Sequence, residues 1–371
     1  MNTLKNCLRY VLLALPLLFF ACKDKDPGPD TDDVVYVGSV DGKLYALDAA
    51  TGTKKWEFLT GGGIYGSSPI VSNGVVYVGS SDNKLYALDA ATGTKKWEFL
   101  TGGGSSNMYS SPAVSNGVVY VGSADTKVYA IDAATGTGKW VFATGDRVLS
   151  SPIVSNGIVY VGSYDNKLYA FDAVTGAKKW EFLTAGDLEA TPVVSNGLVY
   201  VGSSDKKFYA IDAAIGTKKW EFLTTGSGLY WGAAVSNGVV YIADSGGKAY
   251  ALDAVTGTRK WDFQSTNTGS NGSFGRTTSV ANGIVYTGFY NTRYALDAAT
   301  GSKKWELVTG GDARHATISN GTFYCGSQDG KLYVTDAATG TGKWSFSAGG
   351  INGYACVVTK QGKVVRGNPG D

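Results

Sequence analysis

The chain has 371 residues, of which 43% are hydrophobic and 17% are charged, and its formal net charge is +2. This balance leaves no basic field to hold nucleic acid, and a single histidine argues against a zinc site built from histidine and cysteine. Glycine is abundant, with 52 residues, and no helical periodicity follows residue 25. We therefore expect an all-β chain of short strands and tight turns.

The N-terminal segment has the features of a targeting signal. A basic start precedes an apolar run, residues 10–20, that is too short to remain as a membrane-spanning helix. The run leads directly to Cys22, an arrangement that resembles a bacterial lipoprotein signal, although Phe19 stands where leucine is usual. We expect residues 1–21 to be a signal peptide and Cys22 to be the lipidation site. An ordinary secretory signal followed by an incidental cysteine is the alternative.

Residues 22–33 are expected to form a flexible tether. After Cys22 they are charged and rich in proline, and they contain no apolar side chain. Their acidic character resembles the tethers of some surface-exported lipoproteins, and a plain solvated spacer is the alternative. Cleavage after residue 21 takes away two of the 33 basic residues and none of the 31 acidic ones, which leaves 31 of each. Attachment to the outer membrane is therefore expected through the lipid, with the protein facing the periplasm or the cell surface.

From residue 34 onward one sequence unit is written eight times, and its closing tryptophans lie 39 to 44 residues apart. Such a period with several short strands is typical of a β-propeller. The copy at 66–101 predicts four antiparallel strands that make one blade, at 67–71, 75–80, 84–89 and 96–100. Each closing tryptophan is expected to pack against the neighbouring blade. These docking residues are Trp56, Trp97, Trp140, Trp180, Trp220, Trp261, Trp305 and Trp344.

The segment 46–56 reads Ala-Leu-Asp-Ala-Ala-Thr-Gly-Thr-Lys-Lys-Trp, and the pattern A-x-D-x-x-T-G-x-x-x-W recurs in full or nearly so in the other copies. It resembles the tryptophan-docking repeat of PQQ-type propellers, a family that includes the quinoprotein alcohol dehydrogenases and the BamB-like outer-membrane assembly lipoproteins. The resemblance covers residues 34–371 and implies an eight-bladed propeller of four-stranded antiparallel blades. In the fifth copy Ile215 replaces the turn threonine, which is expected to weaken that turn.

The two ends of the repeated region are expected to close the ring. The first copy begins at Val34, in the second-strand motif, and lacks the strand that precedes this motif in the other copies. Residues 353–358 match the missing strand, so they are expected to complete the first blade and to cover its open edge. Cys325 and Cys356 lie in strand-like runs of an exported protein, so a disulfide and two buried thiols both remain open.

The copies differ most where one blade leads into the next. The turns after the first and third strands are nearly constant and are expected on one face, whereas the variable links are expected on the other. Loops on a rigid scaffold often bind partners, and arginine and aromatic residues are typical interface anchors. We expect a binding rim at one mouth of the central channel, with Arg276 and Arg314 as an anion clamp; sequence drift is the alternative. The rim candidates are Tyr109, Glu189, Tyr230, Trp231, Arg276, Arg314, His315 and Tyr354.

The sequence predicts no catalytic centre. It contains no nucleophile elbow, phosphate-binding loop or calcium loop, and its many turn aspartates repeat with the scaffold. The resemblance implies PQQ and calcium only for the quinoprotein dehydrogenases, which are longer and often carry an adjacent cysteine pair that this sequence lacks. We therefore expect neither cofactor and no enzymatic activity.

The expected function is a lipid-anchored propeller scaffold that binds other envelope proteins or surface glycans at the bacterial outer membrane. The propeller is expected to be monomeric and to bind no nucleic acid. A BamB-like factor for outer-membrane protein assembly and a PQQ-dependent oxidoreductase are the two alternatives.

Overall fold

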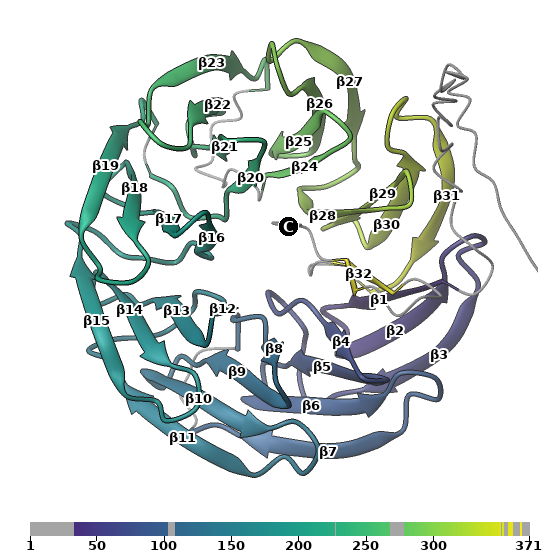
Figure 1. The fold of residues 1–371 in the computed structure, drawn as a ribbon. Helices are drawn as coiled ribbons and strands as arrows, with labels where there is room; N and C mark the ends of the chain where they lie inside the picture. The colour runs from purple at the N-terminus through teal and green to yellow at the C-terminus, as the bar shows by residue number, and fades with distance from the viewer. Residues whose placement is uncertain are drawn as a thin grey trace, which may run out of the picture.

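The computed structural model describes residues 33–102, 108–226, 228–267, 278–349, 351, 355–358 and 364–365; for 314–315, 355–358 and 364–365 it describes the backbone alone. Within these residues the chain is all β, and eight sheets stand around a central axis as an eight-bladed propeller (Figure 1). The predicted fold class is confirmed. The predicted signal peptide, Cys22 and the tether through residue 32 lie outside the described residues. Among the residues described, no helix has the length and apolar character needed to cross a membrane.

The strands follow one another from the centre of the ring outward in blades 2 to 8. Blade 1 holds β1 (Val34–Gly38), β2 (Lys43–Asp48) and β3 (Lys54–Leu59), together with β32 (Ala355–Val358) and β33 (Val364–Val365). Blade 2 holds β4 (Ile70–Ser72), β5 (Val75–Gly79), β6 (Lys84–Asp89) and β7 (Lys95–Leu100). Blade 3 holds β8 (Ala113–Ser115), β9 (Val118–Gly122), β10 (Lys127–Asp132) and β11 (Gly138–Ala143). Blade 4 holds β12 (Ile153–Ser155), β13 (Ile158–Gly162), β14 (Lys167–Asp172) and β15 (Lys178–Leu183). Blade 5 holds β16 (Val193–Ser195), β17 (Leu198–Gly202), β18 (Lys207–Asp212) and β19 (Lys218–Leu223). Blade 6 holds β20 (Ala234–Ser236), β21 (Val239–Ala243), β22 (Lys248–Asp253) and β23 (Arg259–Gln264). Blade 7 holds β24 (Ser279–Ala281), β25 (Ile284–Phe289), β26 (Thr292–Asp297) and β27 (Lys303–Val308). Blade 8 holds β28 (Ala313–Ser319), β29 (Thr322–Ser327), β30 (Lys331–Asp336) and β31 (Gly342–Ser347).

Burial explains why the strands of one blade differ in composition. The second and third strands, such as β5 and β6, are buried on both sides between neighbouring blades, so they are nearly continuous runs of valine, leucine, tyrosine and alanine. The outer strand β7 alternates, with Trp97 and Phe99 turned inward and lysine, glutamate and leucine turned to solvent. The eight hydrophobic clusters are therefore interfaces between blades, and the core is distributed around the ring.

Each docking tryptophan bonds to the next blade. In blade 4 the indole N–H of Trp180 donates to the carbonyl oxygen of Ala213 in blade 5 (3.1 Å), and the ring lies against Gly216, where a Cβ would be 2.7 Å from it. The other seven tryptophans make the same bond at 3.0 to 3.2 Å. A tyrosine of the second strand, here Tyr160, donates its hydroxyl to the same Ala213 carbonyl (3.0 Å). In seven of the eight turns one carbonyl oxygen thereby accepts two aromatic donors, which fixes the angle between those blades. In blade 1 the Ala49 carbonyl accepts Trp344, and the buried hydroxyl of Tyr324 makes no matching bond.

The ends of the chain close the ring as the sequence predicts. Strand β32 pairs antiparallel with β1, with Val357 opposite Val35, and β33 pairs with β32. The eighth docking tryptophan, Trp344, donates to the carbonyl of Ala49 in blade 1 (3.2 Å). Cys325 is buried in β29, and the side chain of Cys356 lies outside the described part of the chain, so their pairing remains open.

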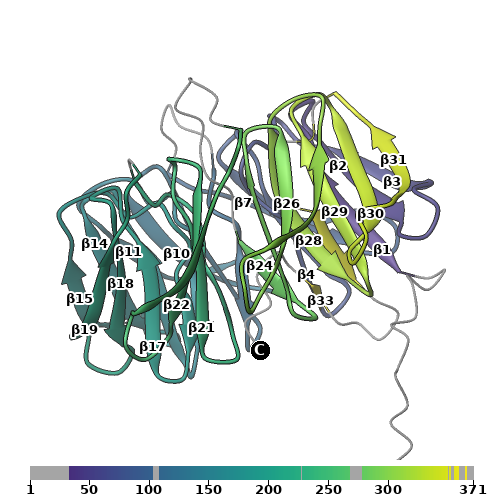
Figure 2. The ribbon, with the colours of Figure 1, turned by 90° about the horizontal axis from the view of Figure 1, so that it is seen from above.

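The disc, seen from above in Figure 2, has two faces, and their loops differ in sequence. On the turn face, the Ser-Asn-Gly and Asp-x-x-Thr-Gly turns meet, as where the N–H of Ala90 donates to the carbonyl of Gly74 (2.9 Å). On the link face, each link between blades meets the hairpin between the second and third strands, as where the N–H of Ser81 donates to the carbonyl of Gly63 (2.9 Å). The predicted separation of constant turns and variable links is therefore present in the structure.

Candidate functional site

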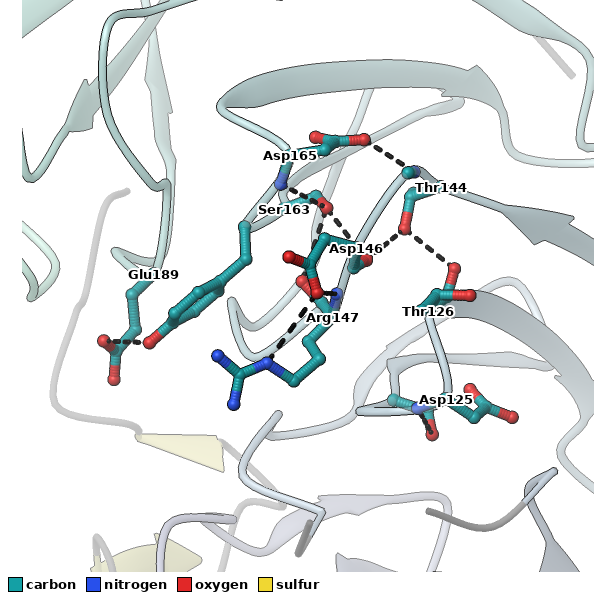
Figure 3. Close-up of polar contacts among 11 residues, drawn as sticks. Asp125, Thr126, Thr144, Asp146, Arg147, Ser163, Asp165 and Glu189 are labelled. Atoms are coloured by element: carbon teal, nitrogen blue, oxygen red, sulfur yellow. Dashed lines mark hydrogen bonds and ion pairs between the residues drawn. The ribbon is translucent and has the colours of Figure 1, made fainter. Parts of the chain in front are cut away.

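The links of the link face are fixed in place by aspartates of the adjoining hairpins. Between blades 3 and 4, the N–H of Gly145 donates to Oδ2 of Asp165 (2.7 Å), and the same oxygen accepts the hydroxyl of Tyr169 (2.6 Å). The hydroxyl of Thr144 donates to the carbonyls of Thr126 (2.7 Å) and Asp146 (2.6 Å) (Figure 3). The variable residues therefore stand on a backbone that is held at several points.

In five of the links a buried apolar side chain, here called the plug, packs against a glycine of the adjoining strand. Val148 is fully buried against Gly122, where a Cβ would lie 2.5 Å from Cγ1 of the valine. Four other links place an apolar side chain on the corresponding strand glycine, namely Ile64 on Gly38, Met108 on Gly79, Leu188 on Gly162 and Leu229 on Gly202. A side chain on these glycines would displace the plug, so glycine in the Val-Gly-Ser motif is required by the link and not by the strand.

Three polar side chains form a connected cluster on this support. The guanidinium carbon of Arg147 lies 4.6 Å from the ring centroid of Tyr164, and the Tyr164 hydroxyl donates to Oε2 of Glu189 (2.7 Å) (Figure 3). Arg147 comes from the link between blades 3 and 4, Tyr164 from the hairpin of blade 4, and Glu189 from the link between blades 4 and 5. We call this the Arg147–Tyr164–Glu189 cluster. Its members are partly buried, and the contacts between them restrict their side-chain conformations.

The surroundings of Glu189 favour the neutral form of its carboxyl group over the charged form more than water does. Burial raises the pKa of Glu189, and the charge of Asp187 adds to the increase, whereas the Tyr164 hydrogen bond and the Arg147 charge oppose it. Burial raises the pKa of Tyr164 as well, followed by the charge of Glu189. Burial and then the charges of Glu189 and Asp187 also raise the pKa of Tyr230, which places this phenol within the field of the same carboxylates.

Two aromatic residues extend the cluster onto the next link. The rings of Tyr230 and Trp231 meet edge to face with centroids 5.4 Å apart, and the Tyr230 ring covers Gly228. Both side chains are partly exposed. Together with the cluster they place charged and aromatic groups on three successive links, between blades 3 and 6.

The eight predicted rim residues have different outcomes. The structure brings Glu189, Tyr230 and Trp231 together. Tyr109 is exposed on a different link, where it packs over Gly66 beside the exposed Tyr65. Arg276 and Tyr354 lie outside the described residues, and Arg314 and His315 lie in β28 with only their backbone described, so the anion clamp stays a prediction.

Two residues of the site were not among the sequence candidates. Arg147 lies one position before Val148, the buried plug of this link. The role of Val148 becomes clear only from the structure, where it fills the space beside Gly122. Tyr164 occupies a hairpin position where other copies carry small residues such as Ser81, Ala124 and Ser204. Comparing this position between copies would have found two aromatic residues, Tyr164 in blade 4 and Tyr290 in blade 7, and of these only Tyr164 precedes the repeated aspartate.

The expectation that this chain holds neither PQQ nor calcium stays a prediction. The quinoprotein dehydrogenases of the same fold hold PQQ with calcium, which requires several oxygen ligands at one point. Among the described residues no group of three or more histidine, cysteine, aspartate or glutamate side chains is placed to hold a metal ion.

The repeat, the docking tryptophans and the variable link face define the class of the protein, an eight-bladed propeller of PQQ-type repeats. The sequence model described as "Outer membrane protein assembly factor BamB" matches residues 23–140, 105–189, 183–277 and 264–368, and the chain belongs to this family. No curated protein matches the sequence significantly.

Solved structures share the fold at low sequence identity. BamB from Moraxella catarrhalis is 20% identical over 84% of this chain and 96% of its own, with a TM-score of 0.71. The computationally designed Ika8 protein is 18% identical over 81% and 95%, with a TM-score of 0.69. A europium-containing methanol dehydrogenase is 16% identical over 83% of both chains, with a TM-score of 0.67. These likenesses show a common fold, and that fold serves both an assembly factor and an enzyme.

Proposed function

We propose that this chain is a non-enzymatic scaffold, anchored to the outer membrane by a lipid on Cys22, whose link face binds another envelope protein during the assembly of outer-membrane proteins. Membership of the BamB family supports the proposed role in the assembly of outer-membrane proteins. The observation that supports the binding face is the Arg147–Tyr164–Glu189 cluster with Tyr230 and Trp231, because these residues break an otherwise constant repeat at adjoining positions.

The chemistry of the site suits a protein partner. Arginine, tyrosine and tryptophan are the residues that contribute most to protein interfaces, particularly where neighbouring groups already hold them in one conformation. Tyr164 is held by Arg147 on its face and by Glu189 at its hydroxyl, so little side-chain entropy remains to be lost on binding. The mature chain would carry no net charge, so recognition would rest on these local contacts and not on long-range attraction.

The proposal is tested by capturing partners from gently solubilised membranes with the tagged protein and a double variant, Arg147→Ala with Trp231→Ala. The wild-type protein should recover components of the outer-membrane assembly machinery. Loss of the two residues should weaken the binding of the recovered component by roughly 30-fold or more, since even one anchor residue is typically worth about 2 kcal/mol. The measurement is mass spectrometry of the captured proteins, followed by titration of the purified partner.

The matched control is Arg259→Ala, which removes an exposed arginine from outer strand β23, away from the link face. This variant should bind like the wild-type protein, and all three proteins should unfold at similar temperatures. Equal capture by the double variant and the wild-type protein would contradict the role of the link face. Recovery of glycan-handling proteins alone would contradict the assembly role and favour a surface-binding scaffold.

A further inference from the structure

The turn face carries three exposed apolar side chains that the repeat does not require. Val174, Ile215 and Val255 are 83%, 64% and 76% exposed. Val174 and Val255 stand where the other copies have alanine, and Ile215 stands where the others have threonine. All three lie in the Asp-x-x-Thr-Gly turn, whose backbone is the same in every copy, so their apolar character contributes nothing that the smaller residues do not also provide.

These side chains lie on three consecutive blades, 4, 5 and 6. The turns that carry them join β14 to β15, β18 to β19, and β22 to β23. In the ring of eight, blade 5 is opposite blade 1, and Figure 1 shows these strands across the central axis from β1, β2 and β3. The apolar tips therefore form an arc along one side of the turn face.

The N-terminal end of the propeller lies on the same face, on the opposite side of the ring. Val34 at the start of β1 pairs with Asp48, the first residue of a turn on this face. The preceding residue, Asp33, accepts the N–H of Ala49 at its carbonyl (3.0 Å) and the side-chain amide of Asn320 at Oδ2 (3.0 Å). The twelve residues from Cys22 to Asp33 span at most about 40 Å, so a lipid on Cys22 would keep this face near the membrane.

The charges around the tips are neutralised within each blade. Lys179 pairs with Asp172 (3.5 Å), and the equivalent lysines of blades 5 and 6 pair with their own turn aspartates at 3.1 and 3.2 Å. Such a surface neither repels a bilayer nor selects anionic lipids. Contact with lipid would therefore depend on the apolar tips and change little with salt.

We infer that the turn face lies against the lipid bilayer, with Val174, Ile215 and Val255 inserted at the interface and the lipid anchor holding the opposite side of the ring. The inference rests on the lipidation of Cys22 included in the proposed function. A single hydrocarbon anchor gives one point of attachment, and the apolar arc supplies a second. Two points across the ring hold the disc parallel to the membrane, so that the link face with its charged and aromatic site is directed away from the lipid.

The test uses the full protein purified from membranes and added to phosphatidylcholine vesicles, with and without brominated acyl chains, which quench nearby tryptophan fluorescence. Trp140, Trp180 and Trp220 dock directly beneath the three turns, against Gly176, Gly216 and Gly257. We expect bromolipid to quench the wild-type protein. The triple variant Val174→Ala, Ile215→Thr, Val255→Ala should lose at least half of that quenching, with no change between low and high salt. Each substitution introduces the residue that other copies carry at that position, so the fold is preserved.

The matched control is the triple variant Leu100→Ala, Leu183→Ala, Leu223→Ala. It removes side chains that are 63 to 66% exposed at the other end of the outer strands, where Ala143 of blade 3 already provides the precedent. This control should be quenched like the wild-type protein. Equal quenching of both triple variants, or a wild-type protein that is not quenched or not bound, overturns the inference. Partner capture by the link face is measured separately, so its failure would be distinguished from a failure here.

Discussion

Glu189, a residue of the proposed binding face, lies in an environment that costs the folded protein stability. Its carboxyl group is partly buried beneath the link face and keeps one strong hydrogen bond, from Tyr164. Burial nevertheless dominates and raises its pKa, so the charged form is less stable in the folded protein than in the unfolded chain. Titratable groups whose pKa values are shifted by burial are common at functional sites.

Replacing Glu189 with glutamine should stabilise the protein at neutral pH. Since the pKa is raised above its ordinary value of 4.5 on folding, the folded state binds more protons than the unfolded chain in the window above pH 4.5, and stability falls as the pH rises through that window. Glutamine carries no charge, so Glu189→Gln should melt at a higher temperature than the wild-type protein at pH 7.5. This advantage should disappear as the pH approaches 4. Calorimetry across this range measures the effect.

The control is Glu181→Gln, because the neighbouring Lys167 and Lys178 lower the pKa of Glu181 by hydrogen bonding. Its contribution has the opposite sign: it is present above pH 4.5 and is lost as the pH falls. This variant should be slightly less stable than the wild-type protein at pH 7.5. The assignment to Glu189 is wrong if both variants change stability in the same direction.

At this scale the sequence predicted part of the site. Glu189, Tyr230 and Trp231 were found because they break the repeat where the chain enters an inner strand. Arg147 was missed because the links were compared after aligning the copies on their first strands. The position of Arg147 is set instead by the next residue, Val148, which is buried against Gly122. The contact of a guanidinium with a tyrosine ring 17 residues away depends on packing between a link and a hairpin, which a comparison of repeats does not contain.

At the scale of elements, one glycine per turn serves two physical needs. Gly176 has a φ of +74°, which favours glycine, and its missing side chain also leaves room for the ring of Trp140. The Asp-x-x-Thr-Gly motif thus contains both the turn and the receiving half of the blade interface. The donating half is the tryptophan that follows in the same repeat. A blade that keeps both the turn glycine and the docking tryptophan can therefore pack against any other blade that does the same.

The two needs can be separated by experiment within blade 4. Gly157 has a φ of +72°, and a Cβ added there would have nothing within 4 Å, whereas at Gly176 a Cβ would lie 2.7 Å from the Trp140 ring. Gly157→Ala should cost about 1 kcal/mol through the backbone alone. Gly176→Ala should cost about 1–3 kcal/mol more, because the indole must move. Chemical denaturation of both variants gives the difference, and equal losses would show that the tryptophan contact is compliant.

The hairpin of blade 6 and the turn of blade 5 keep most of their hydrogen bonds although a residue of the repeat is substituted in each. In blade 6 the hairpin aspartate is missing, and Asp244 from the preceding strand end accepts the N–H of Gly226 (2.9 Å) and the hydroxyl of Tyr250 (2.9 Å) in its place. In blade 5, Asp212 still accepts the N–H groups of Ala214 (3.0 Å) and Ile215 (3.2 Å), and only the threonine hydroxyl is lost. The sequence shows the substitutions, but the compensation depends on which carboxylate reaches the same donors.

At the scale of the whole molecule, the period predicted the number of blades and the way the ring closes. The missing first strand of blade 1 was assigned to residues 353–358, and β32 at 355–358 takes that position. This assignment was possible because the repeats are so alike in sequence that any complete copy shows which strand the first copy lacks. The sequence did not show that second-strand tyrosines share the docking carbonyl with the tryptophans, since no spacing rule links residues more than 50 positions apart.

Removing residues 350–371 should open the ring. The deletion takes away β32 and leaves an unpaired edge on β1, while the docking of Trp344 remains. We expect the melting temperature to fall by roughly 5–10 °C, since the lost pairing is worth several kcal/mol in a domain of this size. Scanning calorimetry measures this. Removing only residues 366–371, which follow β33, should have little effect. A similar fall in both truncated proteins would mean that the pairing of β32 does not hold the ring closed.

The docking arrangement leaves the ring without a natural first blade. Every blade offers a tryptophan to its successor and receives one from its predecessor, and the eighth serves the first in the same way. The break between β1 and β32 could stand in any other blade without removing a tryptophan docking contact. What the position of the break does determine is the point on the circumference from which the tether departs. A circular permutation would therefore change the angle around the ring between the tether and the charged and aromatic site. Selection can change this angle without changing the stability of the propeller.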